Sequence, residues 1–547
     1  MVLFANILFS LLQSWPARES VALQAHAAAP TVQLGHATVV GVRNGSLESF
    51  LGIPYAQPPI GDLRLSLPQR IESYHGALNA TAYGHPCLQQ ALNLFGSFPP
   101  EVLQGLKPLQ EAMSLSANVT ESEDCLNLNI VRPANISADV KLPVVFWIYG
   151  GGFVTGSNAV SLYNGTAFVK RSIELDEPVI YVAVNYRLHV MGFLGGKEIK
   201  EAGLGNLGLH DQRAALLWVH QFISAFGGDP SRVTIWGEIA GAISVFLQLF
   251  ANDSNTEGLF RAGIMSSGFA VPTGDITEGQ DVYDFVVDHV GCSNTTDTLR
   301  CLKNVPADRL LTAANTVSPS SALPFLPRAD GSFIKMPPMH LPLNGKIADV
   351  PFIAGDVKDE GTFFSFGTLN ITTDEEVANY VSSVWFPGAS PSNVNTLLEL
   401  YSSDPAAGSP FDTGKANAFS PQFKRIAAMQ GDWLFHAPRR LLLDKVSGNQ
   451  FAYNFMSARG NFPGIGDFHG SDLFNALGGG DMSDYFIRFV RHLDPNVATG
   501  VYWPPYKPTT RLTLQFNEGS IPLNVTTDEQ RLAGTKELTA LALRFPA

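Results

Sequence analysis

One stretch of ten residues, 233–242, constrains the fold more than any other part of the 547-residue chain. It reads VTIWGEIAGA, and its first four residues predict a short buried strand. The apolar run from Ala242 to Phe250 predicts a helix packed beneath that strand. Because glycine has no Cβ, Gly237 and Gly241 let the strand and the helix approach closely. The residue between them, Ile239, is therefore expected to project from the top of the sheet.

A strand, a glycine-flanked turn and a helix form the nucleophile elbow of the α/β-hydrolases, where the middle residue of Gly-x-Ser-x-Gly is serine. Other motifs of that group occur in order: GIPYAQPP at 52–59, SEDCLNLN at 122–129 and AFGGDPSRVTIWGE at 225–238. From about Thr38 onward the chain resembles the type-B carboxylesterase/lipase family, the cholinesterase-like branch of the α/β-hydrolases. Within that family it is most similar to secreted fungal lipases with a long disulfide-bounded lid. The resemblance implies a large, mostly parallel central sheet with helices on both faces and a lid insertion.

The chain is expected to form one domain. No linker, low-complexity run or repeat divides it, although its length alone would allow three or four domains of roughly 150 residues. Alternating strand-like and helix-like runs favour a single α/β domain over residues 30–547. Residues 1–29 combine an apolar run with small residues, which is typical of a cleaved signal peptide, although no Lys or Arg precedes the run. A buried first strand or a membrane anchor is the alternative, but the run is short for a bilayer span.

Several features favour an extracellular protein. The four cysteines are even in number, and their spacing fits neither zinc nor redox motifs. The resemblance implies the disulfides Cys87–Cys125 and Cys292–Cys301, which form in oxidising compartments. Asn-x-Ser/Thr sequons, the acceptor sites for N-glycosylation, occur at Asn44, Asn79, Asn118, Asn135, Asn164, Asn252, Asn294, Asn370 and Asn524. The net charge of −13, with no basic tract, argues against nucleic acid and anionic membranes as partners.

The segment between Cys87 and Cys125, residues 87–125, is the predicted lid. Leu103 and Leu106, and Leu109 and Met113, have helical spacing with polar residues between them. Further apolar residues in the loop are Leu92, Leu94, Phe95 and Phe98. An amphipathic segment tied at both ends can cover an apolar pocket when closed and contact a lipid–water interface when open. An ordinary surface helix packed on the body would produce the same pattern.

Glycines after a second strand are candidates for the oxyanion hole. Residues 142–149 predict a buried strand that runs into Gly150, Gly151 and Gly152. Three residues without Cβ atoms let a substrate oxygen approach backbone N–H groups. The family resemblance assigns two donors to Gly151 and Gly152, and a third to the N–H of Ala240.

The acid and the base of a catalytic triad are predicted far downstream, in the α/β-hydrolase order of nucleophile, acid and histidine. Glu360 follows a predicted strand and lies in DEGTFF, which resembles the acid motif of the family; Asp356 and Asp359 are neighbouring alternatives. His469 is the one histidine among 12 in the His-x-x-Asp context of the family. A solvated loop carboxylate is the alternative for Glu360.

Isoleucine at the nucleophile position blocks this chemistry. Its side chain can neither attack a carbonyl carbon nor donate a proton, and loss of a triad serine lowers turnover by roughly a millionfold. A β-branched residue is also strained at the positive φ expected of an elbow. Ser244, Ser266 and Ser267 are nearby hydroxyls, but none is expected beside an oxyanion donor. A single base change converts a serine codon to isoleucine, and a non-catalytic role or a deliberate substitution would also account for Ile239.

The resemblance therefore implies a secreted carboxylic ester hydrolase that works through an acyl-enzyme, without metal or organic cofactor, on an apolar ester or lipid. Ile239 predicts that this copy is inactive or severely impaired. The alternative function is a secreted, non-catalytic binding protein on the same scaffold. Ile239 favours that alternative, whereas the retained Glu360 and His469 argue against it.

Overall fold

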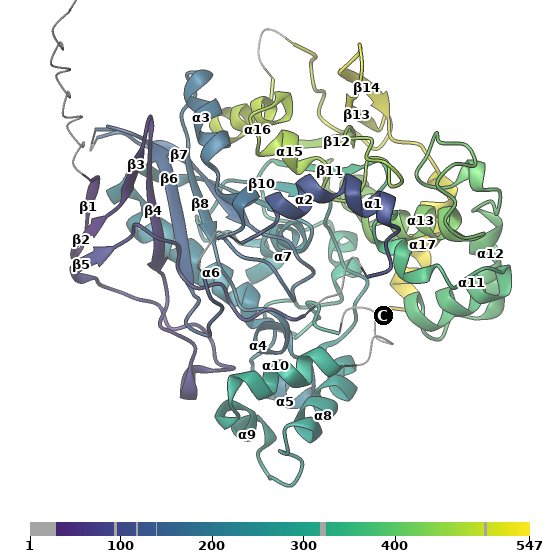
Figure 1. Ribbon diagram of the computed structural model, residues 1–547, viewed down its shortest axis with the longest axis horizontal. Helices are drawn as coiled ribbons and strands as arrows, with labels where there is room; N and C mark the ends of the chain where they lie inside the picture. Colours follow the sequence, from purple (N-terminus) through teal and green to yellow (C-terminus); the bar gives the residue numbers. More distant parts are fainter. Residues whose placement is uncertain (1–28, 92–95, 116–118, 138, 318–323, 497–499) are drawn as a thin grey trace, which may run out of the picture.

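The computed structural model describes residues 29–91, 96–115, 119–137, 139–317, 324–496 and 500–547 (Figure 1). The predicted signal peptide, apart from its last residue, lies outside these ranges. So do Leu92, Leu94 and Phe95 of the predicted lid and the sequon at Asn118. Within the described ranges, no helix has the length and the apolar character needed to cross a bilayer.

An 11-stranded sheet forms the centre of the molecule. From one edge to the other its strands are β14 (Leu523–Thr527), β13 (Leu512–Asn517), β12 (Ala452–Ala458), β11 (Phe352–Val357), β10 (Ala262–Ser266), β9 (Gly228–Glu238), β7 (Leu142–Ile148), β8 (Ile180–Val184), β6 (Asn127–Pro133), β4 (Leu47–Pro54) and β3 (Val42–Asn44). The strands from β8 to β13 run parallel, and those at both ends pair antiparallel. The predicted mostly parallel sheet is confirmed.

A second, smaller sheet lies at the N-terminal end and has the order β1 (Thr31–Leu34), β2 (His36–Val40) and β5 (His75–Asn79). The chain from Thr38 to Leu51 is divided between the two sheets. Its first residues pair with β1 and β5, whereas β3 and β4 form the antiparallel hairpin.

Helices cover both faces of the large sheet (Figure 1). The α-helices are α1 (Pro100–Gly105), α2 (Lys107–Ala112), α3 (Thr166–Glu174), α4 (His189–Phe193), α5 (Lys197–Glu201), α6 (Leu207–Phe222), α7 (Ala240–Ser254), α8 (Gln280–His289), α9 (Thr298–Asn304), α10 (Ala307–Thr316), α11 (Asp374–Tyr380), α12 (Pro391–Glu399), α13 (Phe423–Gly431), α14 (Ala437–Val446), α15 (Leu473–Ala476), α16 (Asp481–His492) and α17 (Leu532–Arg544). Helical geometry in α7 ends before Ala251, which has ψ 156°.

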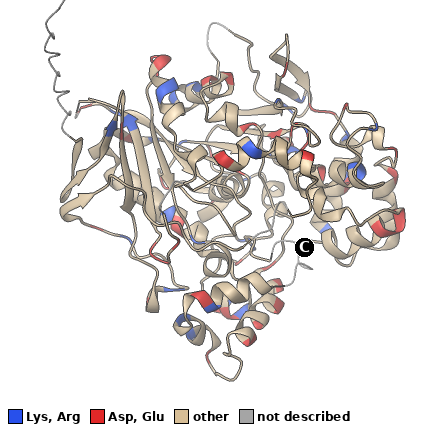
Figure 2. Ribbon diagram, in the orientation of Figure 1, with Lys and Arg blue, Asp and Glu red and all other residues tan. Residues whose placement is uncertain are grey.

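Neighbouring residues of β9 explain the two helical layers, because successive side chains of a strand point to opposite faces. The Trp236 ring contacts Phe168 of α3 and Phe486 of α16, each at 5.3 Å between ring centroids. Ile235, the residue before it, lies on the side of Val245 of α7. Both are completely buried, as are the other apolar residues of β9 from Val233 onward. Charged residues are sparse on the central strands and of mixed sign on the surrounding helices (Figure 2).

The contact between β9 and α7 is unusually close. A Cβ atom on Gly237 would lie 2.2 Å from the carbonyl carbon of Gly241, and one on Gly241 would lie 1.9 Å from the Ile148 oxygen. No real Cβ atom tolerates such distances to backbone atoms, so both positions require glycine. The glycines thereby fix where α7 begins relative to β7 and β9.

Replacing Gly241 by alanine is expected to lower the free energy of unfolding by about 1–3 kcal/mol or more, because the added methyl group forces the backbone apart. Gly448 is a matched control, since a Cβ atom there would meet nothing within 4 Å. Gly448→Ala is expected to change stability by less than about 0.5 kcal/mol. Urea unfolding of the two variants beside the parent measures the difference, and equal stability would contradict the close-contact argument.

Candidate active site

Ile239 occupies the tip of the turn between β9 and α7, with φ 55° and ψ −117°. The positive φ predicted for this position is present. The Ile239 N–H donates to the Ser266 carbonyl at 3.0 Å, and its own carbonyl accepts from the Ile243 N–H at 2.9 Å. A Cβ atom placed on Gly150 would lie 3.0 Å from the Ile239 Cβ and 3.3 Å from its Cδ1. The half-buried isoleucine side chain thus lies against the glycine loop that follows β7.

That glycine loop is held in a conformation that favours glycine. Gly151 and Gly152 have φ 118° and 63°. The Gly151 carbonyl accepts from the N–H groups of Val154 and Thr155 at 3.2 and 3.1 Å. Across the described residues, no acceptor is found for the N–H of Gly151 or Gly152. Ala240 is the first residue of α7, where an N–H has no acceptor within the helix.

His469 and Glu360 form a buried pair. The Nδ1 atom of His469 lies 2.5 Å from Oε2 of Glu360, and the other carboxylate oxygen accepts from the Val357 N–H at 2.9 Å. The imidazole lies beside the rings of Phe364 and Phe435, at 5.0 and 4.6 Å between centroids. The Nε2 atom is buried and has no hydrogen-bond partner among the described residues. An N–H at Nδ1 directed to Glu360 leaves Nε2 as a free acceptor.

The two alternative acids are used elsewhere. Asp356 is buried and accepts from the Arg439 Nε at 2.7 Å. Asp359 accepts from the Ser409 hydroxyl at 2.8 Å and from the Phe411 N–H at 2.7 Å. Both carboxylates therefore hold neighbouring segments together.

The three nearby serines are also engaged or enclosed. The Ser244 hydroxyl donates to the Ala240 carbonyl at 2.8 Å. The Ser266 hydroxyl accepts from the Trp236 indole at 3.2 Å. Ser267 is completely buried, with φ 53°, and its hydroxyl has no partner among the described residues.

Two buried carboxyl groups near the pair were not assigned from the sequence. Burial, followed by the charges of Asp472 and Glu360, raises the pKa of Glu238 well above its ordinary value. Burial and the charge of Glu360 raise the pKa of Asp472 to about 7. Neither carboxylate oxygen of Glu238 has a hydrogen-bond partner within the described residues. The sequence signal was available, because Glu238 is an acidic residue at the end of an otherwise apolar strand.

The predicted lid covers the loop that carries His469. The helices α1 and α2 lie inside the loop closed by the Cys87–Cys125 disulfide, whose S–S bond is present, as is that of Cys292–Cys301. Their apolar side chains join a hydrophobic cluster that is separate from the main core. Its buried members are Phe98, Val102, Leu106, Leu109, Phe366, Phe423, Ile465 and Phe468. Since Phe468 belongs to this cluster and directly precedes His469, the two helices pack against the segment that positions the imidazole.

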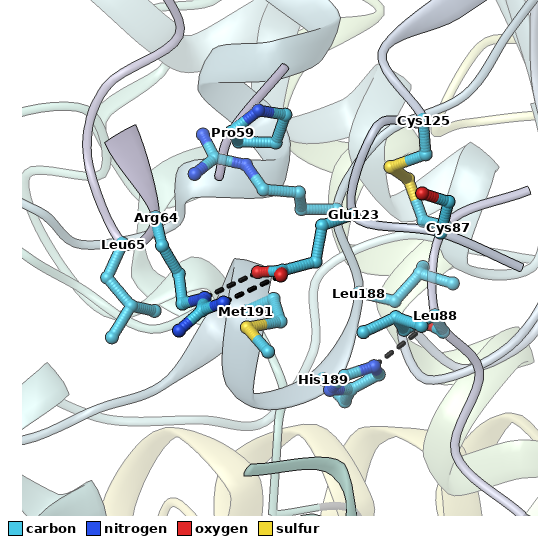
Figure 3. Close-up of a pocket in the computed structure, with 12 residues that line it drawn as sticks. Pro59, Arg64, Leu65, Cys87, Leu88, Glu123, Cys125, Leu188, His189 and Met191 are labelled. Atoms are coloured by element: carbon cyan, nitrogen blue, oxygen red, sulfur yellow. Dashed lines mark hydrogen bonds and ion pairs between the residues drawn. A yellow bond between two sulfur atoms is a disulfide. The ribbon is translucent and has the colours of Figure 1, made fainter. Parts of the chain in front are cut away.

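A small cavity lies at the base of the lid loop (Figure 3). It has a volume of about 10 Å³, and the disulfide of the lid loop forms part of its wall. Arg64 donates to Glu123 across it at 2.7 Å, and burial lowers the pKa of His189 to about 4. A larger cavity of about 270 Å³ has a polar lining that includes Lys358, His436, Arg440 and Arg531. Neither of these two cavities is lined by Ile239, Glu360 or His469.

Metal chemistry was not expected from the sequence. Over the ranges that the structure describes, no group of three or more His, Cys, Asp or Glu side chains is arranged to hold a metal ion.

Comparison with known proteins places this geometry in a family. A model of the carboxylesterase family matches residues 28–533. Lipase 2 of Diutina rugosa is 41% identical over 501 residues, which cover 88% of this chain and 90% of that protein. Secreted lipase 1 of Botryotinia fuckeliana is 42% identical over 519 residues, 90% of each chain. The crystal structure of Aspergillus niger EstA superposes with a TM-score of 0.79 at 28% identity, covering 95% of this chain and 99% of EstA. The resemblance seen in the motifs is thus confirmed, and the chain belongs to the carboxylesterase family.

Proposed function

We propose that the chain is a secreted carboxylic ester hydrolase by descent, built for a Ser-His-Glu acyl-enzyme mechanism and disabled by isoleucine at the nucleophile position. The pairing of His469 with Glu360, with Nε2 buried and unpartnered among the described residues, carries this proposal. An imidazole held in this way has its basic nitrogen free to accept a proton, and no described residue donates one to it. Ile239 stands at the elbow where that donor is expected.

In a form with serine at position 239, each residue would have the role that the family resemblance implies. The Nε2 atom of His469 would take the hydroxyl proton while oxygen attacks the ester carbonyl carbon. Glu360 would hold the ring and stabilise the imidazolium. The N–H groups of Gly151, Gly152 and Ala240 would donate to the oxyanion. The imidazolium would then protonate the leaving alcohol, and water would release the acid by the same steps.

The raised pKa values of Glu238 and Asp472 suit this mechanism. A neutral Glu238 adds no negative charge beside the oxyanion that forms on the substrate. Glu360 is the carboxylate that contacts the imidazole. Burial therefore separates the carboxyl groups of the site into one that pairs with His469 and others that favour the protonated form.

The substrate class and the location are supported by the relatives and by the chain itself. The relatives are named lipases, and one of those compared is named a secreted lipase. The apolar face of α1 and α2 would shield an apolar acyl group, and in an open lid it could contact a lipid–water interface. The two disulfides fit an oxidising compartment and therefore support secretion.

A non-catalytic binding role is the second candidate, and Ile239 favours it. The isoleucine fills space beside Gly150 and removes the nucleophile, while the fold around it stays intact. A binding protein would keep the closed pocket but would have no use for the buried His469–Glu360 pair.

Ile239→Ser is expected to raise hydrolysis of a short-chain p-nitrophenyl ester by roughly 10³-fold or more, since a missing triad serine costs up to about a millionfold. Ile239→Ala is the control that removes the isoleucine without supplying a hydroxyl, and Ile239→Ser with His469→Ala removes the base. Both are expected to stay inert. Activity in the unaltered chain would show that the nucleophile lies elsewhere. A folded but inert serine variant would favour the binding role.

Ile239→Ser is also expected to leave the thermal unfolding midpoint unchanged or higher. The lost burial of a half-buried isoleucine, about 1 kcal/mol, is offset by relief of a β-branched residue at φ 55°. Ile243 is the matched control, because it is half-buried in α7. Ile243→Ser is expected to lower the midpoint. Equal losses in the two variants would argue against backbone strain at position 239.

Asp472→Asn is expected to stabilise the fold at pH 8 and to have little effect at pH 4. The unfolded chain ionises Asp472 near 3.8, whereas burial raises its folded pKa to about 7. As the pH rises from about 4 to about 7, the free energy of unfolding therefore falls by on the order of 2–4 kcal/mol. Urea midpoints at the two pH values measure this effect.

Asp481→Asn is the contrasting control for Asp472→Asn. Partial burial acts to raise the pKa of Asp481, but hydrogen bonds from Arg459 and Asn475 lower it below its ordinary value. The Nη1 atom of Arg459 lies 2.6 Å from Oδ1 of Asp481. This carboxylate stabilises the fold above the unfolded pKa, so Asp481→Asn is expected to be less stable than the parent at pH 8. A pH-independent effect of Asp472→Asn would contradict the raised pKa.

A further inference from the structure

Three of the four edge strands of the two sheets carry an Asn-x-Ser/Thr sequon. Asn44 lies in β3 and Asn524 in β14, the two edges of the large sheet. Asn79 lies in β5, an edge of the small sheet. These strands are only three to five residues long, and within the described ranges no interior strand holds a sequon. The other described sequons lie in helices, turns and loops.

Two of the three edges carry no charged residue, although charged residues on an edge strand oppose edge-to-edge pairing. Strands β5 (HGALN) and β14 (LNVTT) contain no Lys, Arg, Asp or Glu. Arg43 in β3 is engaged with Glu48 and with Asn135. Val42 and Val525 are 39% and 36% exposed, and they are the large exposed hydrophobic residues that the described strands contain. Each lies within two residues of a sequon asparagine.

The asparagine side chains at these edges can accept a sugar. Asn44 and Asn79 are exposed and Asn524 is half-buried, and their Nδ2 atoms donate no hydrogen bond to another described residue. The hydroxyl of Thr81 donates to the Asn79 Oδ1 at 2.8 Å, so the two side chains of that sequon already lie together. Asn164 differs, because its Nδ2 donates to the Ser161 carbonyl at 2.7 Å.

We propose that Asn44, Asn79 and Asn524 carry N-linked glycans that keep the sheet edges from pairing with strands of a second chain. A bulky, hydrated glycan on an edge strand occupies the space that an incoming strand would need. The proposal rests on the secretion included in the proposed function, and it is independent of the hydrolytic chemistry.

The modification requires an oligosaccharide carried on a lipid pyrophosphate as the co-reactant. The Nδ2 atom forms a bond to C1 of the first sugar and loses one proton. The bond between C1 and the pyrophosphate oxygen breaks, and the lipid pyrophosphate leaves with the electron pair of that bond. No oxidant or reductant is consumed.

The full-length chain, secreted from a fungal host, provides the test. Enzymatic removal of N-glycans converts each modified asparagine to aspartate, so peptide mass spectrometry reports occupancy site by site. We expect occupancy at Asn44, Asn79 and Asn524. Unmodified asparagine at these three sites in the secreted chain would overturn the proposal. Esterase activity of Ile239→Ser would be unaffected by that result, so the two proposals fail separately.

The protective role is tested with two triple variants. The edge variant combines Asn44→Gln, Asn79→Gln and Asn524→Gln, and the matched control combines Asn252→Gln, Asn294→Gln and Asn370→Gln, which lie outside strands. Size-exclusion chromatography with light scattering is expected to show several-fold more aggregate for the edge variant than for the control. Equal aggregation of the two would overturn the role of the edge glycans.

Two further variants separate the glycan from the amide. Ser46→Ala, Thr81→Ala and Thr526→Ala together abolish the same sequons while keeping the asparagines, and they are expected to aggregate like the edge variant. Val42→Lys with Val525→Lys, added to the edge variant, is expected to restore the monomer, because charges on an edge oppose pairing. Aggregation that persists after both lysines are added would show that it does not proceed through the β3 and β14 edges of the large sheet.

Discussion

The arrangement of the site depends on the contact between two pieces of backbone, at Gly241 of α7 and the Ile148 carbonyl of β7. No side chain fits between them, so the helix must start directly above the strand. Residue 239 is then forced into a positive φ whatever its side chain is. This explains how an isoleucine can stand in a turn that disfavours it while the histidine, the acid and the glycine loop keep their places.

Charge burial is the second constraint around the site. Asp356 lies beneath the Glu360 loop and is neutralised by Arg439, whose guanidinium also lies 3.0 Å from Asp528. Glu238 and Asp472 have no such cation, and their pKa values rise instead. A carboxylate in this interior either finds a cation or takes up a proton. The chain uses both solutions around the same site, with Asp356 in β11, Glu238 in β9 and Asp472 at the start of α15.

Much of the fold and of the candidate site could be predicted from the sequence, because the information is local. The glycines of the elbow, the triple glycine after β7 and the short motifs around Glu360 and His469 each specify their own backbone. The family and the mostly parallel sheet were confirmed, whereas the catalytic roles of these residues stay predictions.

Other features depend on distant partners. Nothing near Glu238 in the sequence reveals that Asp472 lies beside it, and the pairing of β2 in the small sheet depends on β5. The covering of the His469 loop by α1 and α2 likewise joins segments more than 350 residues apart.

The strand order has a consequence for how such a chain emerges from the ribosome. From β10 onward each strand of the large sheet pairs with the strand that precedes it in the chain. A nascent chain therefore always has the partner of its next strand already in place, and the sheet can grow outward one strand at a time. Glu360 follows β11 and His469 follows β12, so the two halves of the buried pair meet only after most of the translation is complete. Until then Glu360 has no imidazole partner, and the strand added last forms the free edge of the incomplete sheet.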